Sequence, residues 1–209
     1  MYFAPEKSVA EKARLGGYHH RLPILEDHEV RRRITMRSNR GECTTHHKVF
    51  PIQRYAVDGR AEVERRLLAY PSSGRVAAQA TAFLIDQLVR LSHDFTVEHL
   101  YPANNRSAGE RITLIAVGGY GRGEMAPHSD VDIGFLTPFK QTSWTEQVIE
   151  AQLYTLWDLG LKVGHSSRSL EEMIRAAKED LTVRTALLEG RFVWGDRDLY
   201  DQAAARFDA

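Results

Sequence analysis

Two carboxylates spaced two residues apart, Asp130 and Asp132, follow a glycine pair at Gly118-Gly119. Successive side chains of a strand alternate between its two faces, so residues two apart point the same way. The spacing therefore predicts that both carboxylates leave one face. They would repel each other there without a cation, and Mg²⁺ takes oxygen ligands and completes its shell with substrate phosphates. The expected chemistry is phosphoryl displacement, with magnesium ions clamping the attacking and leaving oxygens.

The residues before the acid pair favour binding of the phosphates. Gly118 and Gly119 directly follow the apolar run 112–117. Glycine has no Cβ, so its backbone amide can approach a phosphate closely, and successive amides in a turn form an anion-binding nest. Arg122 is a further phosphate candidate through its guanidinium fork, and Ser129 is another through its hydroxyl. These four residues form the expected nucleotide-binding set.

Two other phosphate-binding motifs do not fit this segment. The Walker A motif requires a lysine, which the region lacks. The dinucleotide fingerprint requires G-x-G-x-x-G and a distant acid, whereas Gly119, Gly121 and Gly123 give G-x-G-x-G. A purely structural alternative is a tight glycine turn beside solvated edge aspartates. Two acids within an otherwise apolar strand make that alternative costly, because burial of an unpaired charge is unfavourable.

The surrounding sequence predicts the elements that position these residues. Apolar, β-branched runs predict strands at 112–117, 130–136 and 161–167. Helical spacing predicts helices at 59–70, 75–101, 143–160, 169–180, 181–188 and 199–207. The expected fold class is α/β of the α+β type: a small mixed sheet of about three or more strands flanked by helices, with a helical N-terminal extension. Residues 1–55 are expected to form a partly irregular arm and residues 56–209 the catalytic domain.

The amino-acid composition argues against several classes of protein. The 209 residues carry 28 Lys+Arg and 28 Asp+Glu, so zero net charge gives no broadly basic surface for nucleic acid. A single cysteine, Cys43, excludes an internal disulfide framework. No apolar run has the length of a signal peptide or a membrane span. We therefore expect a cytoplasmic protein with neither a nucleic-acid nor a membrane partner.

The segment VGGYGRGEMAPHSDVDIGFL resembles the signature of the nucleotidyltransferase superfamily. More closely, it is similar to the N-terminal domain of the bacterial PII uridylyltransferase/uridylyl-removing family. The likeness extends upstream through HLYPANNRSAGERITLIAV and downstream through LYTLWDLGLKVGHSSRSLEE and EDLTVRTALLEGRFVWGD, covering roughly residues 58–199.

That resemblance implies a reaction and roles for the motif residues. UTP would give UMP to a tyrosine hydroxyl of the PII signalling protein and release pyrophosphate, in a step tied to nitrogen regulation. Gly118 and Gly119 would hold the triphosphate, and Asp130 and Asp132 would hold Mg²⁺. Arg122 and Ser129 would be weaker phosphate contacts.

The sequence departs from the resemblance in two respects. Many superfamily members carry a third acid on a later strand, whereas 161–167 has none. Asp180 is an alternative third acid, although a helix-cap role fits it better. The base that activates the tyrosine is unassigned, and the choice between UTP and ATP stays open.

The second departure is length, because the family's full enzymes continue into a phosphohydrolase domain and two ligand-sensing domains. No uridylyl-removing activity and no glutamine sensing are expected of this truncated chain. Two alternatives to the uridylyltransferase hypothesis stay open: an inert fragment that binds nucleotide or PII, and a nucleotidyltransferase with another acceptor.

Overall fold

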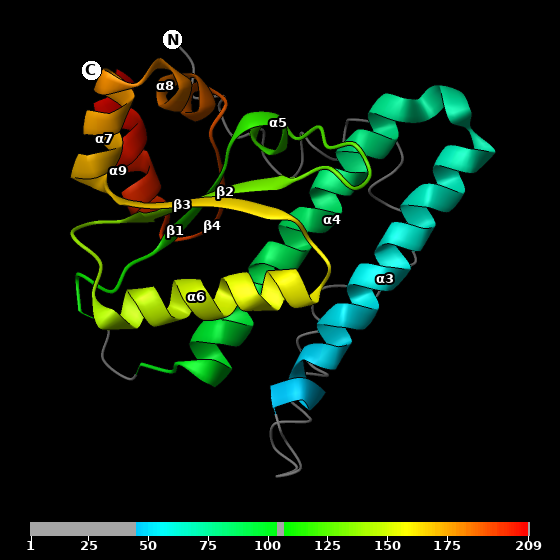
Figure 1. The fold of residues 1–209 in the computed structure, drawn as a ribbon, viewed down its shortest axis with the longest axis horizontal. Helices are drawn as coiled ribbons and strands as arrows, with labels where there is room; N and C mark the ends of the chain where they lie inside the picture. Colours follow the sequence, from blue (N-terminus) through cyan, green and yellow to red (C-terminus); the bar gives the residue numbers. More distant parts are fainter. Residues whose placement is uncertain (1–44, 104–106, 209) are drawn as a thin grey trace.

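The computed structural model describes residues 45–103 and 107–208 (Figure 1). Two long helices open this part of the chain, α3 (Thr45–Ala69) and α4 (Gly74–Phe95), joined by a 3₁₀ turn at Pro71–Ser73. They pack side by side as a hairpin, and a π-helical turn at Thr96–Leu100 ends the second. Leu84, Leu88 and Leu91 of α4 are each at most 1% exposed, so the amphipathic pattern of this helix marks its core face as expected.

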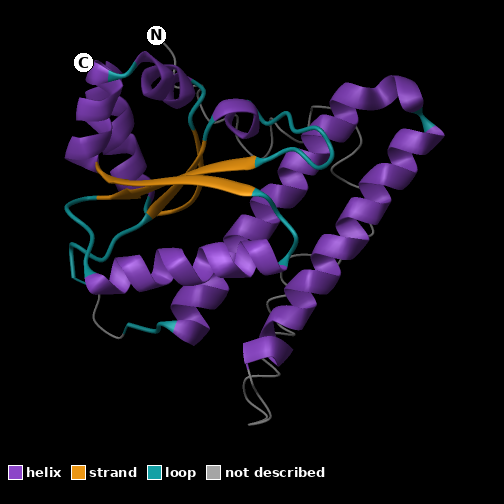
Figure 2. Cartoon of the chain, viewed as in Figure 1, coloured by secondary structure: helices purple, strands orange, loops and turns teal. Residues whose placement is uncertain are grey.

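The centre of the domain is a four-stranded mixed sheet in the order β3-β2-β1-β4 (Figure 2). The strands are β1 (Thr113–Ala116), β2 (Val131–Thr137), β3 (Val163–Ser169) and β4 (Arg191–Gly195). Strand β1 pairs antiparallel with β2 and β4, and β2 pairs parallel with β3. The parallel pair is connected through helix α6 (Ser143–Asp158), which supplies the crossover that parallel strands require.

Helices cover both faces of the sheet. On one face, α4 and α6 enclose the larger apolar core, which takes in Leu114, Val131 and Ile133. On the other face, a second core around Ile115 and Leu136 packs against α7 (Leu170–Glu179), α8 (Leu181–Leu188) and α9 (Arg197–Asp208). Figure 1 shows these last three helices grouped on one side of the strands and α6 on the other. The side chains of neighbouring residues in β1 and in β2 therefore pack into different apolar cores.

Local sequence signals explain several helix boundaries. Ser169 caps α7 in a capping box with Glu172, whose carboxylate accepts a hydrogen bond from the Ser169 amide at 2.8 Å. Asp180 caps α8 by accepting hydrogen bonds from Thr182 N at 2.7 Å and Val183 N at 3.3 Å. Its carboxylate therefore plays the helix-cap role that the sequence favoured.

The expected fold class is confirmed, with two differences in its elements. Helix α3 begins at Thr45, well before the predicted start near Asp58, and continues through Pro51. Strand β4 was not anticipated and adds a fourth strand beside β1.

The predicted division of the chain lies largely outside what the structure describes. Most of the expected arm falls within residues 1–44, and the boundary between residues 55 and 56 lies inside α3. Ile52 and Tyr55 already belong to the larger core, although the division between arm and domain stays a prediction. No helix in the described ranges is long and apolar enough to cross a membrane.

Candidate active site

The two aspartates lie at the start of the central strand β2. Val131 and Ile133 are each 1% exposed and point into the larger core, whereas Asp132 between them is exposed. The strand begins at Val131, one residue later than predicted, so Asp130 is an exposed residue directly before it. The alternation that the sequence predicted thus holds from Val131 to Ile133, and it brings Asp132 out of the sheet on the face opposite the larger core.

The glycine pair lies next to this carboxylate. Strand β1 ends beside the start of β2, where Val117 N donates a hydrogen bond to Asp132 O at 3.1 Å. The chain then turns into the short helix α5 (Gly118–Gly121), and Gly118 has a φ of +58°, which favours glycine. A Cβ on Gly118 would lie 3.7 Å from Asp132 Oδ2. The first amides of a helix have no acceptor inside it, and no side chain caps α5, so they are suited to an anion.

A third glycine, Gly164, completes the surroundings of Asp132. The parallel register of β2 and β3 pairs Asp132 with Gly164. A Cβ at Gly164 would lie 2.5 Å from Asp132 Oδ1, closer than real Cβ contacts allow. The Asp132 carboxylate therefore occupies a gap between Gly118 and Gly164. The sequence reasoning missed this role, although a glycine within a strand is a known sign of close approach by another group.

Arg122 and Ser129 take different positions around this centre. The Arg122 guanidinium lies beside Gly119, where a Cβ would be 3.6 Å from Nη2. It also donates to Glu189 Oε2 at 2.6 Å, and this hydrogen bond raises the pKa of Arg122. A phosphate at this place would share Arg122 with Glu189. Ser129 is exposed and lines a cavity next to α3 and α4 instead of the glycine turn.

A buried ion pair that the sequence did not reveal fixes α5 to the rest of the domain. Arg191 on β4 donates two hydrogen bonds of 2.9 Å to the Asp86 carboxylate on α4. The same guanidinium contacts the Tyr120 and Gly121 carbonyl oxygens at 3.3 Å and lies 5.4 Å from the centre of the Tyr120 ring. Burial opposes the charged form of Arg191, but Asp86 and Tyr120 together outweigh this effect, so the pKa of Arg191 is raised. The glycine turn is thereby tied to both α4 and β4.

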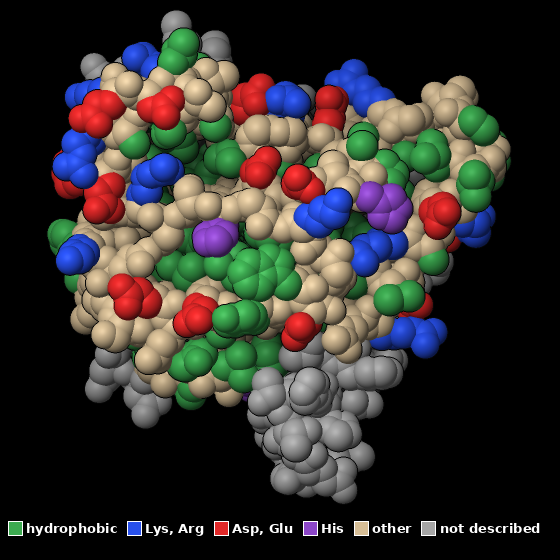
Figure 3. All heavy atoms as spheres, viewed as in Figure 1, with side chains coloured by type: hydrophobic (Ala, Val, Ile, Leu, Met, Phe, Trp, Pro, Cys, Tyr) green, Lys and Arg blue, Asp and Glu red, His purple; other side chains and the backbone are tan. Residues whose placement is uncertain are grey.

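Asp130 and Asp132 supply carboxylate oxygens, the ligand type that a hard divalent cation takes. Within the residues that the structure describes, neither Asp130 nor Asp132 has an ion-pair partner, and no third acid, histidine or cysteine joins them in a cluster. Magnesium is commonly held by one or two carboxylates together with substrate phosphates and water. Because Gly164 has no side chain, Asp132 Oδ1 can lie against β3, and even a Cβ on Gly118 would stay 3.7 Å from Oδ2. Figure 3 shows acidic and basic side chains interspersed over the face of the molecule seen in that view.

Comparison with known proteins identifies the class to which the central part of the chain belongs. Residues 103–193 match the nucleotidyltransferase domain family, a range that contains β1, β2, β3, the first residues of β4 and both aspartates. The fold and this match identify residues 103–193 as a nucleotidyltransferase domain.

Within that class, the chain is similar to the bifunctional uridylyltransferase/uridylyl-removing enzymes of several bacteria. It is 70% identical to that of Novosphingobium aromaticivorans and 61% identical to that of Erythrobacter litoralis, in each case over 76% of this chain. It is 57% identical to that of Rhodospirillum rubrum over 72%. The matched segments make up 18%, 17% and 16% of these relatives. The chain therefore resembles the nucleotidyltransferase part of these enzymes, as its sequence predicted, and spans less than a fifth of the relatives it matches.

Proposed function

We propose that this domain transfers UMP from UTP to a tyrosine hydroxyl of a PII signalling protein and releases pyrophosphate, with Mg²⁺ held by Asp130 and Asp132. The observation that carries the proposal is the position of the Asp132 carboxylate. It lies in the gap between Gly118 at the phosphate-binding turn and Gly164 on the neighbouring strand. A triphosphate on the amides of α5 would place its reacting phosphorus next to this carboxylate. The relatives' name supports uridylyl transfer as the reaction.

The residues of the chain have separate tasks in this proposal. Gly118 and Gly119 bind the phosphates through backbone amides, and Arg122 adds positive charge beside them. Asp130 and Asp132 hold the metal, which when bound neutralises charge on the phosphates and orients the reacting oxygens. The buried Asp86–Arg191 pair keeps α5 in place, so the amides stay preorganised and need little rearrangement when nucleotide binds.

The test is incubation of the chain with labelled UTP, Mg²⁺ and PII protein. Incorporation of label into PII that is abolished by Asp130→Asn supports the proposal, because this substitution removes one charge with little change of shape. Gly134→Ala is a suitable control, since its Cβ would meet only ordinary contacts of 3.7 Å or more. Binding of UTP without label on PII would instead identify a nucleotide-binding piece that needs further parts of the protein. Label on another acceptor, with none on PII, would refute the proposal that PII is the acceptor.

A further inference from the structure

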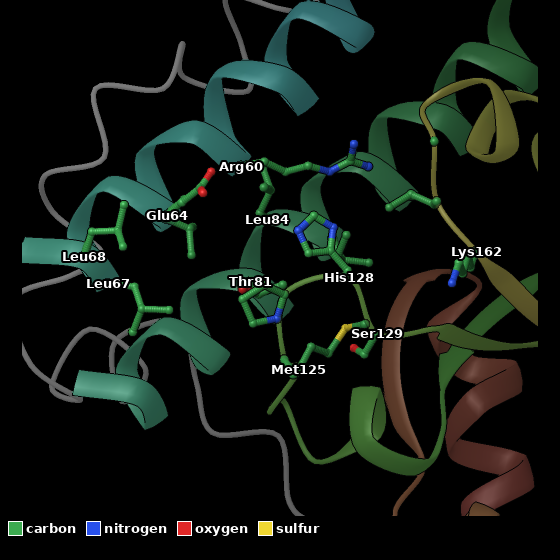
Figure 4. Close-up of a pocket in the computed structure, with 16 residues that line it drawn as sticks. Arg60, Glu64, Leu67, Leu68, Thr81, Leu84, Met125, His128, Ser129 and Lys162 are labelled. Carbon is green, nitrogen blue, oxygen red and sulfur yellow. The ribbon is translucent and has the colours of Figure 1, made fainter. Parts of the chain in front are cut away.

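A cavity of about 310 Å³ lies beside the proposed active site. It is bounded by helices α3 and α4, by the loop 125–129 that leads into β2, and by residues 160–162 that lead into β3. Figure 4 shows Leu67, Leu68 and Glu64 of α3 on one side and Ser129 and Lys162 on the other, with Leu84 and His128 between them. The roles given above to the glycine turn and the aspartates leave this cavity unused.

The interior of the cavity suits an aromatic ring without polar edges. Most of its lining is apolar, including Val63, Leu84 and Met125. Two of its polar groups already have partners: the Thr81 hydroxyl donates to Ala77 O at 2.9 Å, and Arg60 Nη2 donates to Leu159 O at 2.8 Å. A uracil ring buried here would leave carbonyl and N–H groups poorly paired, which is costly. A phenol ring has one polar group at its tip and avoids that cost.

The rim of the cavity carries the polar groups nearest the aspartates. Ser129 directly precedes Asp130, and Lys162 O accepts a hydrogen bond from Val131 N at 2.8 Å. In the described part of the chain, the Lys162 ammonium has no hydrogen-bond or ion-pair partner. His128 holds a φ of +67°, a conformation that is uncommon for a residue with a side chain and often marks functional loops. A hydroxyl at this rim would lie next to the Lys162 ammonium and to Asp130, which directly follows Ser129.

The order of the strands places the cavity on the side from which the acceptor hydroxyl must approach. Gly118 follows β1 and Lys162 precedes β3, so the two lie on opposite sides of the start of β2, which is the middle strand of the three. In an in-line displacement the attacking oxygen approaches opposite the leaving group. If the leaving pyrophosphate lies at the glycine turn, the acceptor must come from the side of Lys162 and the cavity.

We propose that this cavity is the acceptor subsite and takes the aromatic ring of the tyrosine, with its phenolic oxygen at the rim next to Lys162 and Asp130. This inference rests on the proposed function. The phenolic oxygen attacks the α-phosphorus of UTP, an oxygen–phosphorus bond forms, and the α–β anhydride bond breaks to release pyrophosphate. The phenol proton passes to solvent water. Lys162 is a positioning and charge-stabilising residue, because its ammonium favours the phenolate form of the acceptor.

A binding experiment tests the subsite without any need for turnover. The 209-residue chain is titrated with N-acetyltyrosinamide, and backbone amide NMR shifts are followed. We expect shifts at Met125, Leu84 and Lys162. Ala126→Trp should weaken binding at least tenfold, because Ala126 is an exposed lining residue whose replacement fills the cavity without disturbing the core. Ala205→Trp makes the same change at an exposed position on α9 and should have no effect.

Kinetics with labelled UTP and PII then separates the possible occupants. The proposal predicts that Ala126→Trp raises the KM for PII at least tenfold and leaves UTP affinity unchanged. Lys162→Met should lower kcat and shift the pH profile upward, whereas a purely structural role would leave the profile in place. A raised KM for UTP would assign the cavity to the nucleobase and overturn the inference. So would tyrosinamide shifts confined to other regions. Failure of the unaltered chain to label PII would count against the proposed function of this chain and not against the cavity, because the titration with N-acetyltyrosinamide needs no turnover.

Discussion

Substitution of Gly164 by alanine tests whether the Asp132 carboxylate must occupy the gap between the two glycines. The new Cβ would lie 2.5 Å from Asp132 Oδ1, whereas ordinary contact begins at 3.4 Å, so the oxygen must retreat by about 0.9 Å. The obstacle is the end of a flexible, exposed side chain, which can rotate away at little cost. We therefore expect the free energy of unfolding to change by no more than about 1 kcal/mol.

The effect on catalysis should be much larger than the effect on folding. A displacement of about 1 Å at a reacting centre costs about 100-fold in rate, equivalent to about 2.7 kcal/mol of transition-state stabilisation. The assay is transfer of labelled UMP to PII at several Mg²⁺ concentrations, alongside urea unfolding of the same preparation. Gly134→Ala is the matched control, because it adds the same methyl group to β2, two residues beyond Asp132, where contacts stay at 3.7 Å or more.

Two results would refute this reasoning. Full activity of Gly164→Ala would mean that Asp132 does not need its present position. An equal loss in Gly134→Ala would mean that any added methyl group on this sheet face disturbs the enzyme, whatever its distance from the aspartate.

Three further substitutions test UTP binding at the glycine turn, the buried Asp86–Arg191 ion pair and the pH dependence of folding stability. Gly119→Ala meets nothing closer than 3.6 Å and should fold normally, yet UTP affinity measured by calorimetry should fall about tenfold because the methyl group obstructs the amide turn. Arg191→Met should lower the free energy of urea unfolding by about 3–5 kcal/mol, since it leaves Asp86 buried and unpaired. An unchanged free energy of unfolding would argue against a stabilising role of the Asp86–Arg191 ion pair. Asp196→Asn should cost about 1–3 kcal/mol at pH 7, and the difference from the unaltered chain should vanish on acidification. The hydrogen bond from Arg111 lowers the pKa of Asp196. The ionised carboxylate therefore stabilises the fold above the ordinary pKa of an aspartate, and this stabilisation is lost as the pH falls through the lowered pKa. A stability difference that does not depend on pH would contradict this explanation.

Predictability from the sequence differed between elements for physical reasons. Helices α6 and α7 were predicted because helical periodicity and a capping signal occur in one short segment. Strand β4 was missed because it follows α8 after only two residues and is defined by its pairing with the distant strand β1, which no local pattern specifies. The early start of α3 was missed because Pro51 normally disfavours a helix interior. Local signals thus predict elements whose determinants are local.

The same distinction applies to the site. Asp130, Asp132 and the glycine pair were found from sequence because a single strand-turn-strand unit carries them all. The role of Gly164 depends on the parallel register across a crossover helix, which no local pattern specifies. Asp86 and Arg191 are 105 residues apart and meet only after α4 and β4 have packed. Sequence reasoning therefore predicted the groups expected to do chemistry but missed the groups that hold them in place.

That separation also explains why the proposed site can be examined without unfolding the domain. The aspartates are exposed at one end of the sheet, and their neighbours are glycines, so substitutions there change few packing contacts. The stability of the turn comes from elsewhere, chiefly from the buried Asp86–Arg191 pair and the two apolar cores. A variant of Gly119, Asp130 or Gly164 that loses transfer and keeps its unfolding free energy therefore reports on chemistry, whereas a variant of Arg191 that loses both reports on the support of the glycine turn.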